Sequence, residues 1–126
     1  MFLRLKNLKM AQHHKRGLAG EDLAVEYLCR EHYRILQRNY RYGYGEIDII
    51  AEDGNILVFA EVKTFRSKKF GEPEDAVTKK KRDRIRKTAE GYLYQHAIDD
   101  KECRFDVIAI DWERTNPMIR HIKDAF

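Results

Sequence analysis

The stretch GEIDIIAEDGNILVFAEVK, from Gly45 to Lys63, carries charged side chains inside two apolar runs that otherwise predict β-strands. Asp53-Gly54 between the runs is a strong signal for a tight hairpin turn. Because side chains alternate between the two faces of a strand, the charged residues of both strands are expected on one face. These residues are Glu46, Asp48, Glu61 and Lys63.

The register of this hairpin decides which charges meet. A two-residue loop at Asp53-Gly54 pairs Glu52 with Asn55, and the pairs that follow are Ile50–Leu57, Asp48–Phe59 and Glu46–Glu61. Asp48 is then diagonal to Glu61, within reach of a shared ligand. The alternative is an ordinary solvent-exposed polar face. The apolar side chains on the same face argue against it.

Carboxylates crowded on a half-buried face predict a cation site. Like charges directly opposite each other are destabilising, and partly buried carboxylates need protons or a cation. Mg²⁺ (or Mn²⁺) takes oxygen ligands, and Mg²⁺ often uses only one or two carboxylates together with substrate phosphate oxygens. Lys63 follows Glu61 by two residues and can offset the carboxylates while facing an anionic substrate.

A helical pattern from about residue 15 to residue 30 precedes these strands. Its apolar stripe contains Leu23, Ala24, Tyr27 and Leu28. Glu21 has the spacing of this stripe, so we expect it to join the strand acids, directly or through a metal-bound water. A helix-end or surface acid is the alternative for Glu21.

A second helix is expected from Pro73, which suits a first helical turn, to about Ala97. Its inward stripe includes Lys81. A basic cluster surrounds this position, and we take Lys79, Lys80, Lys81 and Arg82 as candidate phosphate contacts. A solvated helix face is the alternative.

The remaining apolar runs complete an α/β pattern. Strands are predicted at Ile35–Tyr42, Glu46–Glu52, Asn55–Lys63 and Arg104–Asp111, with a short one near Met118–Ile122. The order of helix, three strands, helix and one or two strands predicts a mixed β-sheet flanked by helices. Residues 1–14 are expected to form a flexible basic extension and 15–126 a single domain; either Met1 or Met10 could be the native start.

Composition narrows the partners. Lys and Arg outnumber Asp and Glu, 25 to 21, and the pI near 9.1 permits a polyanionic partner without requiring one. The sequence has no apolar run long enough for a membrane span, so we expect a cytoplasmic protein. Cys29 and Cys103 form no metal-ligand spacing and are expected to be buried free thiols.

These segments resemble the restriction-endonuclease-like nuclease superfamily, in which an acidic residue on one strand is followed by Glu-x-Lys on the next. Within it they are similar to the uncharacterised bacterial YraN-like family, whose members resemble archaeal Holliday junction resolvases. The resemblance covers about residues 15–110 and rests on KRGLAGEDLAVEYL, RNYRYGYGEIDIIAEDGNILVFAEVKTF, AVTKKKRDRIRKTAEGYL and RFDVIAI. One departure is Thr64-Phe65-Arg66, because an arginine is expected sooner after the lysine; Arg66 is the candidate for that role.

The resemblance implies a restriction-endonuclease-like fold and Mg²⁺-dependent phosphodiester cleavage of DNA, including branched or junction DNA. It implies that Asp48 and Glu61 hold the metal, with the Val62 carbonyl as a further ligand. Lys63 would orient or activate the attacking water and stabilise the transition state. Glu21 would complete the outer shell and Glu46 would assist. Since junction cleavage needs two cuts, a homodimer is expected.

Two other functions remain open from the sequence. A non-catalytic nucleic-acid-binding module would keep the basic helix without any metal requirement, and an adaptor for other proteins would bind no nucleic acid. Tyr40, Tyr42 and Tyr44 share a strand face and form either a base-stacking platform or edge-strand packing. Asp106 and Trp112 are expected to be structural, with Asp106 pairing with a basic residue such as Arg104.

Overall fold

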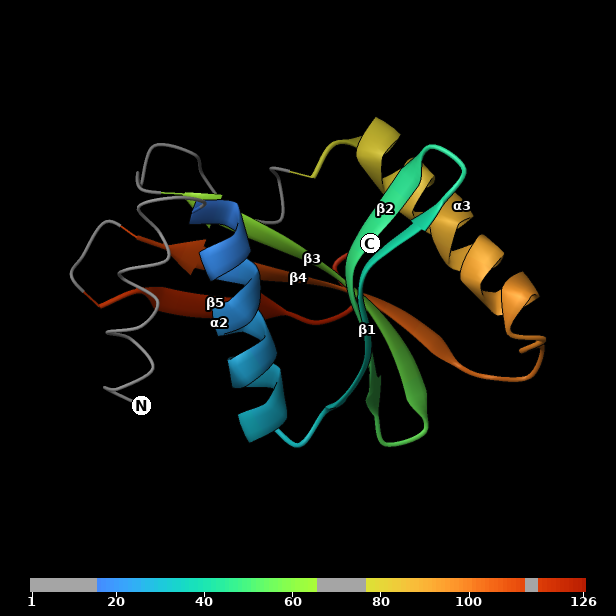
Figure 1. Cartoon of the computed structure of the whole chain (residues 1–126), viewed down its shortest axis with the longest axis horizontal. Helices are drawn as coiled ribbons and strands as arrows, with labels where there is room; N and C mark the ends of the chain where they lie inside the picture. The colour runs from blue at the N-terminus through green and yellow to red at the C-terminus, as the bar shows by residue number, and fades with distance from the viewer. Residues whose placement is uncertain (1–15, 66–76, 113–115) are drawn as a thin grey trace.

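The structure, a computed structural model, describes residues 16–65, 77–112 and 116–126 (Figure 1). The predicted basic extension, the candidate Arg66 and the start of the predicted second helix at Pro73 lie outside these ranges. The elements run in the predicted order, and the last of them forms a fifth strand. They are α2 (Arg16–Arg30), β1 (Arg34–Tyr42), β2 (Gly45–Asp53), β3 (Ile56–Phe65), α3 (Lys79–Gln95), β4 (Cys103–Asp111) and β5 (Met118–Ile122).

The five strands form one sheet in the order β1-β2-β3-β4-β5. β3 and β4 are parallel, and the other neighbouring pairs are antiparallel, so the predicted mixed sheet is confirmed. A parallel pair needs a crossover connection, and α3 lies in the segment between β3 and β4. Among the described residues, no helix is long and apolar enough to cross a membrane.

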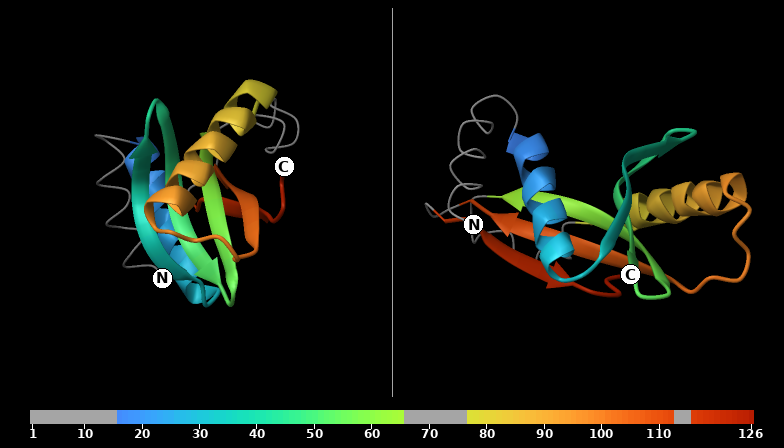
Figure 2. Two further views of the ribbon diagram at one scale, coloured as in Figure 1. Left: turned by 90° about the vertical axis from the view of Figure 1, so that its right-hand side faces the viewer. Right: turned by 60° about the horizontal axis from the view of Figure 1, so that its bottom comes forward.

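The two helices cover opposite faces of the sheet (Figure 2). On β3, Val58 and Ala60 pack in one buried cluster with α2, whereas Leu57 and Phe59 pack in the other cluster with α3. This alternation is the two-residue period of a strand. The sheet therefore buries both faces, which explains why its central strands are apolar on both sides.

The hairpin between β2 and β3 turns at Gly54-Asn55, one residue later than predicted. Asp53 pairs with Ile56 and Ile50 pairs with Phe59, so the predicted pairs Ile50–Leu57, Asp48–Phe59 and Glu46–Glu61 are wrong. Gly54 takes a φ of +60° at the first turn position, where tight hairpin turns require a positive φ. Because the pairing moves by two residues, each β3 side chain keeps its predicted face.

β2 separates from β3 halfway along its length. The last pair between them is Ile49–Ala60, whereas β2 stays paired with β1 to its start. The free half of the β1–β2 hairpin lies on α3 instead: a Cβ on Gly45 would stand 1.8 Å from Thr88 Oγ1. Ile47 consequently packs in the α3 cluster with Ile50, although regular strand alternation predicts that it shares a face with Ile49, which packs in the α2 cluster.

α3 does not start at Pro73. Val77 is a bend and the Thr78 side chain caps the helix by accepting a hydrogen bond from the Lys81 N–H at 3.2 Å. The helix ends at Gln95, and Ala97 has a positive φ of 52°. A continuous helix from Pro73 to Ala97 is therefore wrong, because the threonine cap sets its first turn at Lys79.

The two cysteines do not match the prediction of buried thiols. Cys29 is exposed near the end of α2, and Cys103 is half-buried at the start of β4. Both thiols are free. Cys29 follows the buried Leu28 directly, and the rotation of about 100° between successive helix residues turns its side chain away from the sheet.

A buried polar network joins β4 and β5 to α2. Asp106 is fully buried and accepts hydrogen bonds from both Arg104 Nε and Nη2 at 2.9 Å, as predicted for that pair. His121 Nε2 lies 2.7 Å from Asp106 Oδ2, and its Nδ1 lies 3.0 Å from the Tyr27 hydroxyl on α2. Trp112 is also buried, as predicted. This network supports the half of the sheet that is away from the β1–β2 hairpin.

We expect Asp106→Ala to lower the free energy of unfolding by about 3–5 kcal/mol at pH 7, because it removes the fully buried carboxylate that Arg104, His121 and the Asp124 N–H share and leaves Arg104 with Asp53 as its remaining acid. Burial by itself raises the pKa of Asp106, but hydrogen bonds from His121, Arg104 and the Asp124 N–H outweigh it and lower that pKa overall. The contribution is therefore present above the ordinary pKa of 3.8 and disappears as the pH falls through the lower folded-state value.

Urea denaturation of the wild type and Asp106→Ala at a series of pH values measures the difference in their free energies of unfolding. Asp100→Ala, at an exposed carboxylate, is the matched control and should change stability by less than about 0.5 kcal/mol. An Asp106→Ala cost that stayed constant from pH 7 down to strongly acidic pH would contradict the charge pairing.

Candidate active site

Asp48 lies where both strand ladders around it are interrupted. The β1–β2 pairs pass from Arg38–Ile49 to Tyr40–Ile47 and omit Asp48, while Asn39 on β1 has a φ of +52°. On the other side β3 has already left β2. Asp48 Oδ2 accepts a hydrogen bond from the Val62 N–H at 2.8 Å, so a carboxylate replaces the missing backbone partner of β3. Asp48 thereby bridges the gap between the two strands.

Glu61 is the second acid at this gap. It is buried on β3, with 4% of its surface exposed, and its Oε2 lies 2.7 Å from Lys81 Nζ on α3. The Lys81 side chain remains 41% exposed, so the pair has a buried acid and a base that reaches solvent. The prediction that Lys81 faces inward is confirmed by this contact, which sequence reasoning did not assign to it.

Glu21 comes from α2 on the opposite face of the sheet. Gly20 allows the helix to approach β3 closely, because a Cβ there would lie 2.4 Å from Thr64 Cγ2. Glu21 Oε1 is buried and, within the part of the chain that the structure describes, has no hydrogen-bond partner. The nearest base, Arg38, lies 3.8 Å away through Nη2 and instead bonds Asp22 at 2.7 Å. An unsatisfied buried carboxylate oxygen is costly and therefore points to a missing ligand.

The acids at the gap perturb one another. Burial, then the charge of Glu61, and with a smaller effect that of Glu21, raise the pKa of Asp48 to about 7, against the lowering effect of the Val62 N–H. Burial raises the pKa of Glu21 as well; Asn39 and Arg38 oppose this shift, and Glu46 adds to it. The cluster therefore carries more carboxylates than it can keep ionised without a cation.

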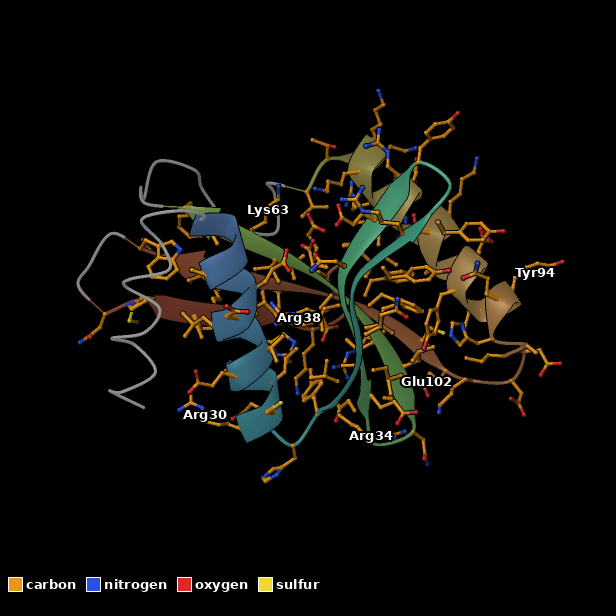
Figure 3. All side chains as sticks on the ribbon, viewed as in Figure 1. Arg30, Arg34, Arg38, Lys63, Tyr94 and Glu102 are labelled. Carbon is orange, nitrogen blue, oxygen red and sulfur yellow. The ribbon has the colours of Figure 1, made fainter. Side chains whose placement is uncertain are left out.

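Lys63 and Glu46 lie at the border of the cluster. Lys63 projects from β3 (Figure 3) with the same strand alternation as Glu61, and it is half-buried. It makes no ion pair with any residue in the described ranges. Glu46 is exposed and lies 3.7 Å from Arg41 Nη2. Its effect on Glu21 places it near the cluster, in a peripheral position.

The candidate phosphate contacts on α3 separate into different roles. Lys81 binds Glu61, and Lys79 lies 3.1 Å from Asp83 in an exposed i,i+4 pair. Lys80 and Arg82 have no ion pair among the residues that the structure covers, and both reach solvent. These two remain candidates for contact with an anionic partner, and Arg66 lies outside the described residues.

The sequence did not single out Arg38 or Asn39. Both act on Glu21, Arg38 by its charge and Asn39 by a side-chain hydrogen bond. Their only signal was their place on the strand before GEID, which does not distinguish them from the other polar residues of that strand. Of the two alternatives for the strand tyrosines, packing holds for Tyr40, which is buried in the α3 cluster with its hydroxyl bonded to Gln95.

The donors at the gap suit a hard divalent cation. They are carboxylate oxygens, two of the three carboxyl groups have raised pKa values, and one buried oxygen, Glu21 Oε1, has no hydrogen bond from any described residue. No three His, Cys, Asp or Glu side chains in residues 16–65, 77–112 and 116–126 are grouped to enclose an ion by themselves. Mg²⁺ does not require such a group, because one or two carboxylates and substrate phosphate oxygens can hold it.

Comparison with known proteins gives a family and no activity. The family model described as "Uncharacterised protein family UPF0102" matches residues 20–110. A UPF0102 protein of Christiangramia forsetii is 46% identical over 117 residues, covering 93% of this chain and 98% of the relative. A UPF0102 protein of Persephonella marina is 49% identical over 111 residues, covering 88% and 92%. These names state no reaction, so the function has to be argued from the site.

We expect Asp48→Asn to stabilise the protein at pH 8 without divalent cations by roughly 1–3 kcal/mol, at about 1.4 kcal/mol per pKa unit. The asparagine keeps an acceptor for the Val62 N–H but removes a charge from a crowded site. A carboxyl whose folded-state pKa is raised from 3.8 to about 7 stabilises the fold at acidic pH, and this stability is lost as pH rises through about 7.

Denaturation in EDTA at pH 5 and pH 8 measures this effect, which should be large at pH 8 and smaller at pH 5. Asp99→Asn, at an exposed acid, is the control and should show no such pH dependence. A loss of stability at pH 8 in Asp48→Asn would contradict the electrostatic description of the cluster.

Proposed function

The chain belongs to the UPF0102 family, and we propose that it is a divalent-metal-dependent endonuclease that hydrolyses phosphodiester bonds in DNA. The observation that carries the proposal is the acid cluster at the gap between β2 and β3. Asp48 and Glu61 lie there beside Glu21, whose Oε1 has no hydrogen-bond partner in the described part of the chain and only a long 3.8 Å ion-pair contact with Arg38, and all three are substantially buried. A cluster of this kind is destabilising unless a cation and its ligands use it.

Asp48 and Glu61 would hold Mg²⁺ or Mn²⁺, with Glu21 in the outer shell and Glu46 at the periphery. The Val62 carbonyl would be a further ligand: the N–H and C=O of a strand residue point to the same side, and the Val62 N–H points into the gap. When bound, the ion would polarise the phosphate and supply a nucleophilic water at neutral pH.

The protein side chains contribute orientation and positive charge. The Val62 N–H fixes the Asp48 carboxylate, and Lys81 Nζ forms an ion pair with Oε2 of the buried Glu61 at 2.7 Å. Lys63, on the Glu61 face of β3, would orient the attacking water and stabilise negative charge on the phosphoryl oxygens as the bond to the leaving oxygen breaks. Its freedom from ion pairs within the described residues suits that role.

We extend the proposal to the fold class and the substrate. A mixed sheet with helices on both faces, an Asp on β2 and Glu-x-Lys on β3 support a restriction-endonuclease-like fold. The exposed Lys80 and the half-buried Arg82 of α3 support a DNA partner, and branched or junction DNA follows from the resemblance in the sequence. Cutting a junction on two strands would need a homodimer.

A non-catalytic DNA-binding module is the second candidate, and the same cations favour it. It differs in one consequence: binding would survive the loss of the acids and would not require a metal. The raised pKa values of Asp48 and Glu21 favour the enzyme, because a binding module gains nothing from buried acids that destabilise it.

We expect cleavage of a labelled four-way junction in Mg²⁺ or Mn²⁺ that stops in EDTA. Asp48→Asn, Glu61→Gln and Lys63→Ala should each reduce the rate at least ~100-fold, because each removes a charge aligned with the reacting phosphate. Titration calorimetry of Mn²⁺ should show binding to the wild type, and this binding should be absent in the Asp48→Asn/Glu61→Gln double variant.

Lys123→Ala is the control for the lysine variant, since Lys123 is an exposed lysine that follows β5 and takes no part in the cluster. Equal cutting by the wild type and the acid variants would show contaminating nuclease. Metal-independent binding of the junction without cleavage, unaffected by loss of the acids, would establish the binding module.

A further inference from the structure

A pocket of about 550 Å³ lies between the tip of the β1–β2 hairpin and α3, on the far side of Gly45 from Asp48. The hairpin contributes residues 42–45, and α3 contributes residues from Arg84 to Tyr94. The pocket exists because β2 leaves β3 and lies on the helix. None of the acids of the cluster lines it.

The rings of this pocket are unusual in their exposure. Tyr44 at the hairpin tip is fully exposed, and Tyr94 is 81% exposed and projects from the end of α3 (Figure 3). Tyr42 packs its ring over Gly91, where a Cβ would stand 2.3 Å from the ring, and so forms a floor between them. Exposed aromatic rings around a preformed hollow are the structural requirement for stacking an unpaired base.

The charge of the pocket suits an anion. Arg84 and Lys87 line it, and neither forms an ion pair with another residue in the described ranges. Glu90 is the acid of the lining, so the lining carries two cations to one anion. A nucleotide offers both parts of the complement: a base for the tyrosines and a phosphate for the cations.

The pocket and the acid cluster lie along the same two elements. Gly45 precedes Asp48 by three residues on β2, which corresponds to about 10 Å of strand. On α3, Lys81, Arg84 and Lys87 recur every third residue, so each neighbours the next in an inclined row that turns by about 120° around the helix and rises about 9 Å. A row of cations therefore runs from Glu61 to the pocket, and its length matches roughly three stacked nucleotides of one strand.

We propose that this pocket binds an unstacked nucleotide of the DNA substrate, about three nucleotides from the bond that is cut. The base stacks on Tyr44 and Tyr94, and Arg84 and Lys87 bind the flanking phosphates. This inference rests on the proposed nuclease function for the position of the cut bond. It assigns to the protein a preference for DNA that offers an unpaired or easily unstacked base.

The test is binding of a short single-stranded oligonucleotide that contains 2-aminopurine, whose fluorescence falls when the base stacks on an aromatic ring. Measured in EDTA, this binding is independent of cleavage. We expect quenching by the wild type and a dissociation constant raised about five-fold or more in Tyr44→Ala and in Tyr94→Ala, with quenching lost. Tyr44→Phe keeps the ring and should behave like the wild type. Lys87→Ala should weaken binding and reduce its salt dependence.

Two surface variants are matched controls. Met118→Ala removes another exposed apolar side chain, on β5, and Arg34→Ala removes an exposed cation at the opposite end of β1 from Tyr42. Both should bind as the wild type does. The proposed role of the pocket would be overturned if the wild type, Tyr44→Ala and Tyr94→Ala bound equally, or if the oligonucleotide did not bind at all. Either result would count whatever the cleavage assay shows. Tyrosine-dependent binding in a protein that does not cleave DNA would support the pocket and reject the proposed nuclease function.

Discussion

The separation of β2 from β3 after the pair Ile49–Ala60 is the constraint on which the site depends. In a continuous sheet, residues from opposite faces cannot meet, because the backbone lies between them. The gap lets Glu21 from the α2 face and Glu61 from the α3 face both act on Asp48. Two glycines set its dimensions: Gly20 allows α2 to reach Thr64, and Gly45 allows the hairpin to reach Thr88.

An acid cluster of this kind reduces stability, and other parts of the chain offset that cost. Lys81 contacts Glu61 directly and belongs to a different element. The ion pair between them therefore forms only when α3 is packed against the sheet. On the other half of the sheet, the buried Asp106 is satisfied by Arg104, His121 and a backbone N–H. One half of the molecule thus has fully satisfied buried charge, and the other half has buried charge that lacks ligands. A protein under selection for stability alone would have no use for the second arrangement.

The strand and helix order could be read from the sequence because period and turn chemistry are local. The positions of Glu21 and Lys81 on inward helix faces followed from helical spacing in the same way. The register of the hairpin could not be predicted from the sequence. Asp53-Gly54 and Gly54-Asn55 are both good turns, and tertiary packing decides between them. The face of Ile47 and the pairing of Lys81 with Glu61 could not be found either, because both result from the hairpin leaving the sheet, which no local pattern records. Pro73 predicted an earlier start of the second helix because proline suits a first helical turn, whereas the Thr78 side chain caps the helix that begins at Lys79.

The faces of α3 have different roles in the structure. Ile85, Thr88 and Tyr92 are buried and hold the helix against the sheet and the hairpin. Arg86 lies over the rings of Phe105 and Phe126, so its charge is engaged in packing near the C-terminus. The high count of basic residues on this helix therefore does not describe a uniform positive surface. Lys79 and Arg86 have partners of their own, Lys80 and Arg82 have no ion pair among the described residues, and the row of Lys81, Arg84 and Lys87 runs from Glu61 to the pocket. The one acid that lines the pocket, Glu90, comes after the last cation of the row, so no acid of the lining separates Arg84 from Lys87.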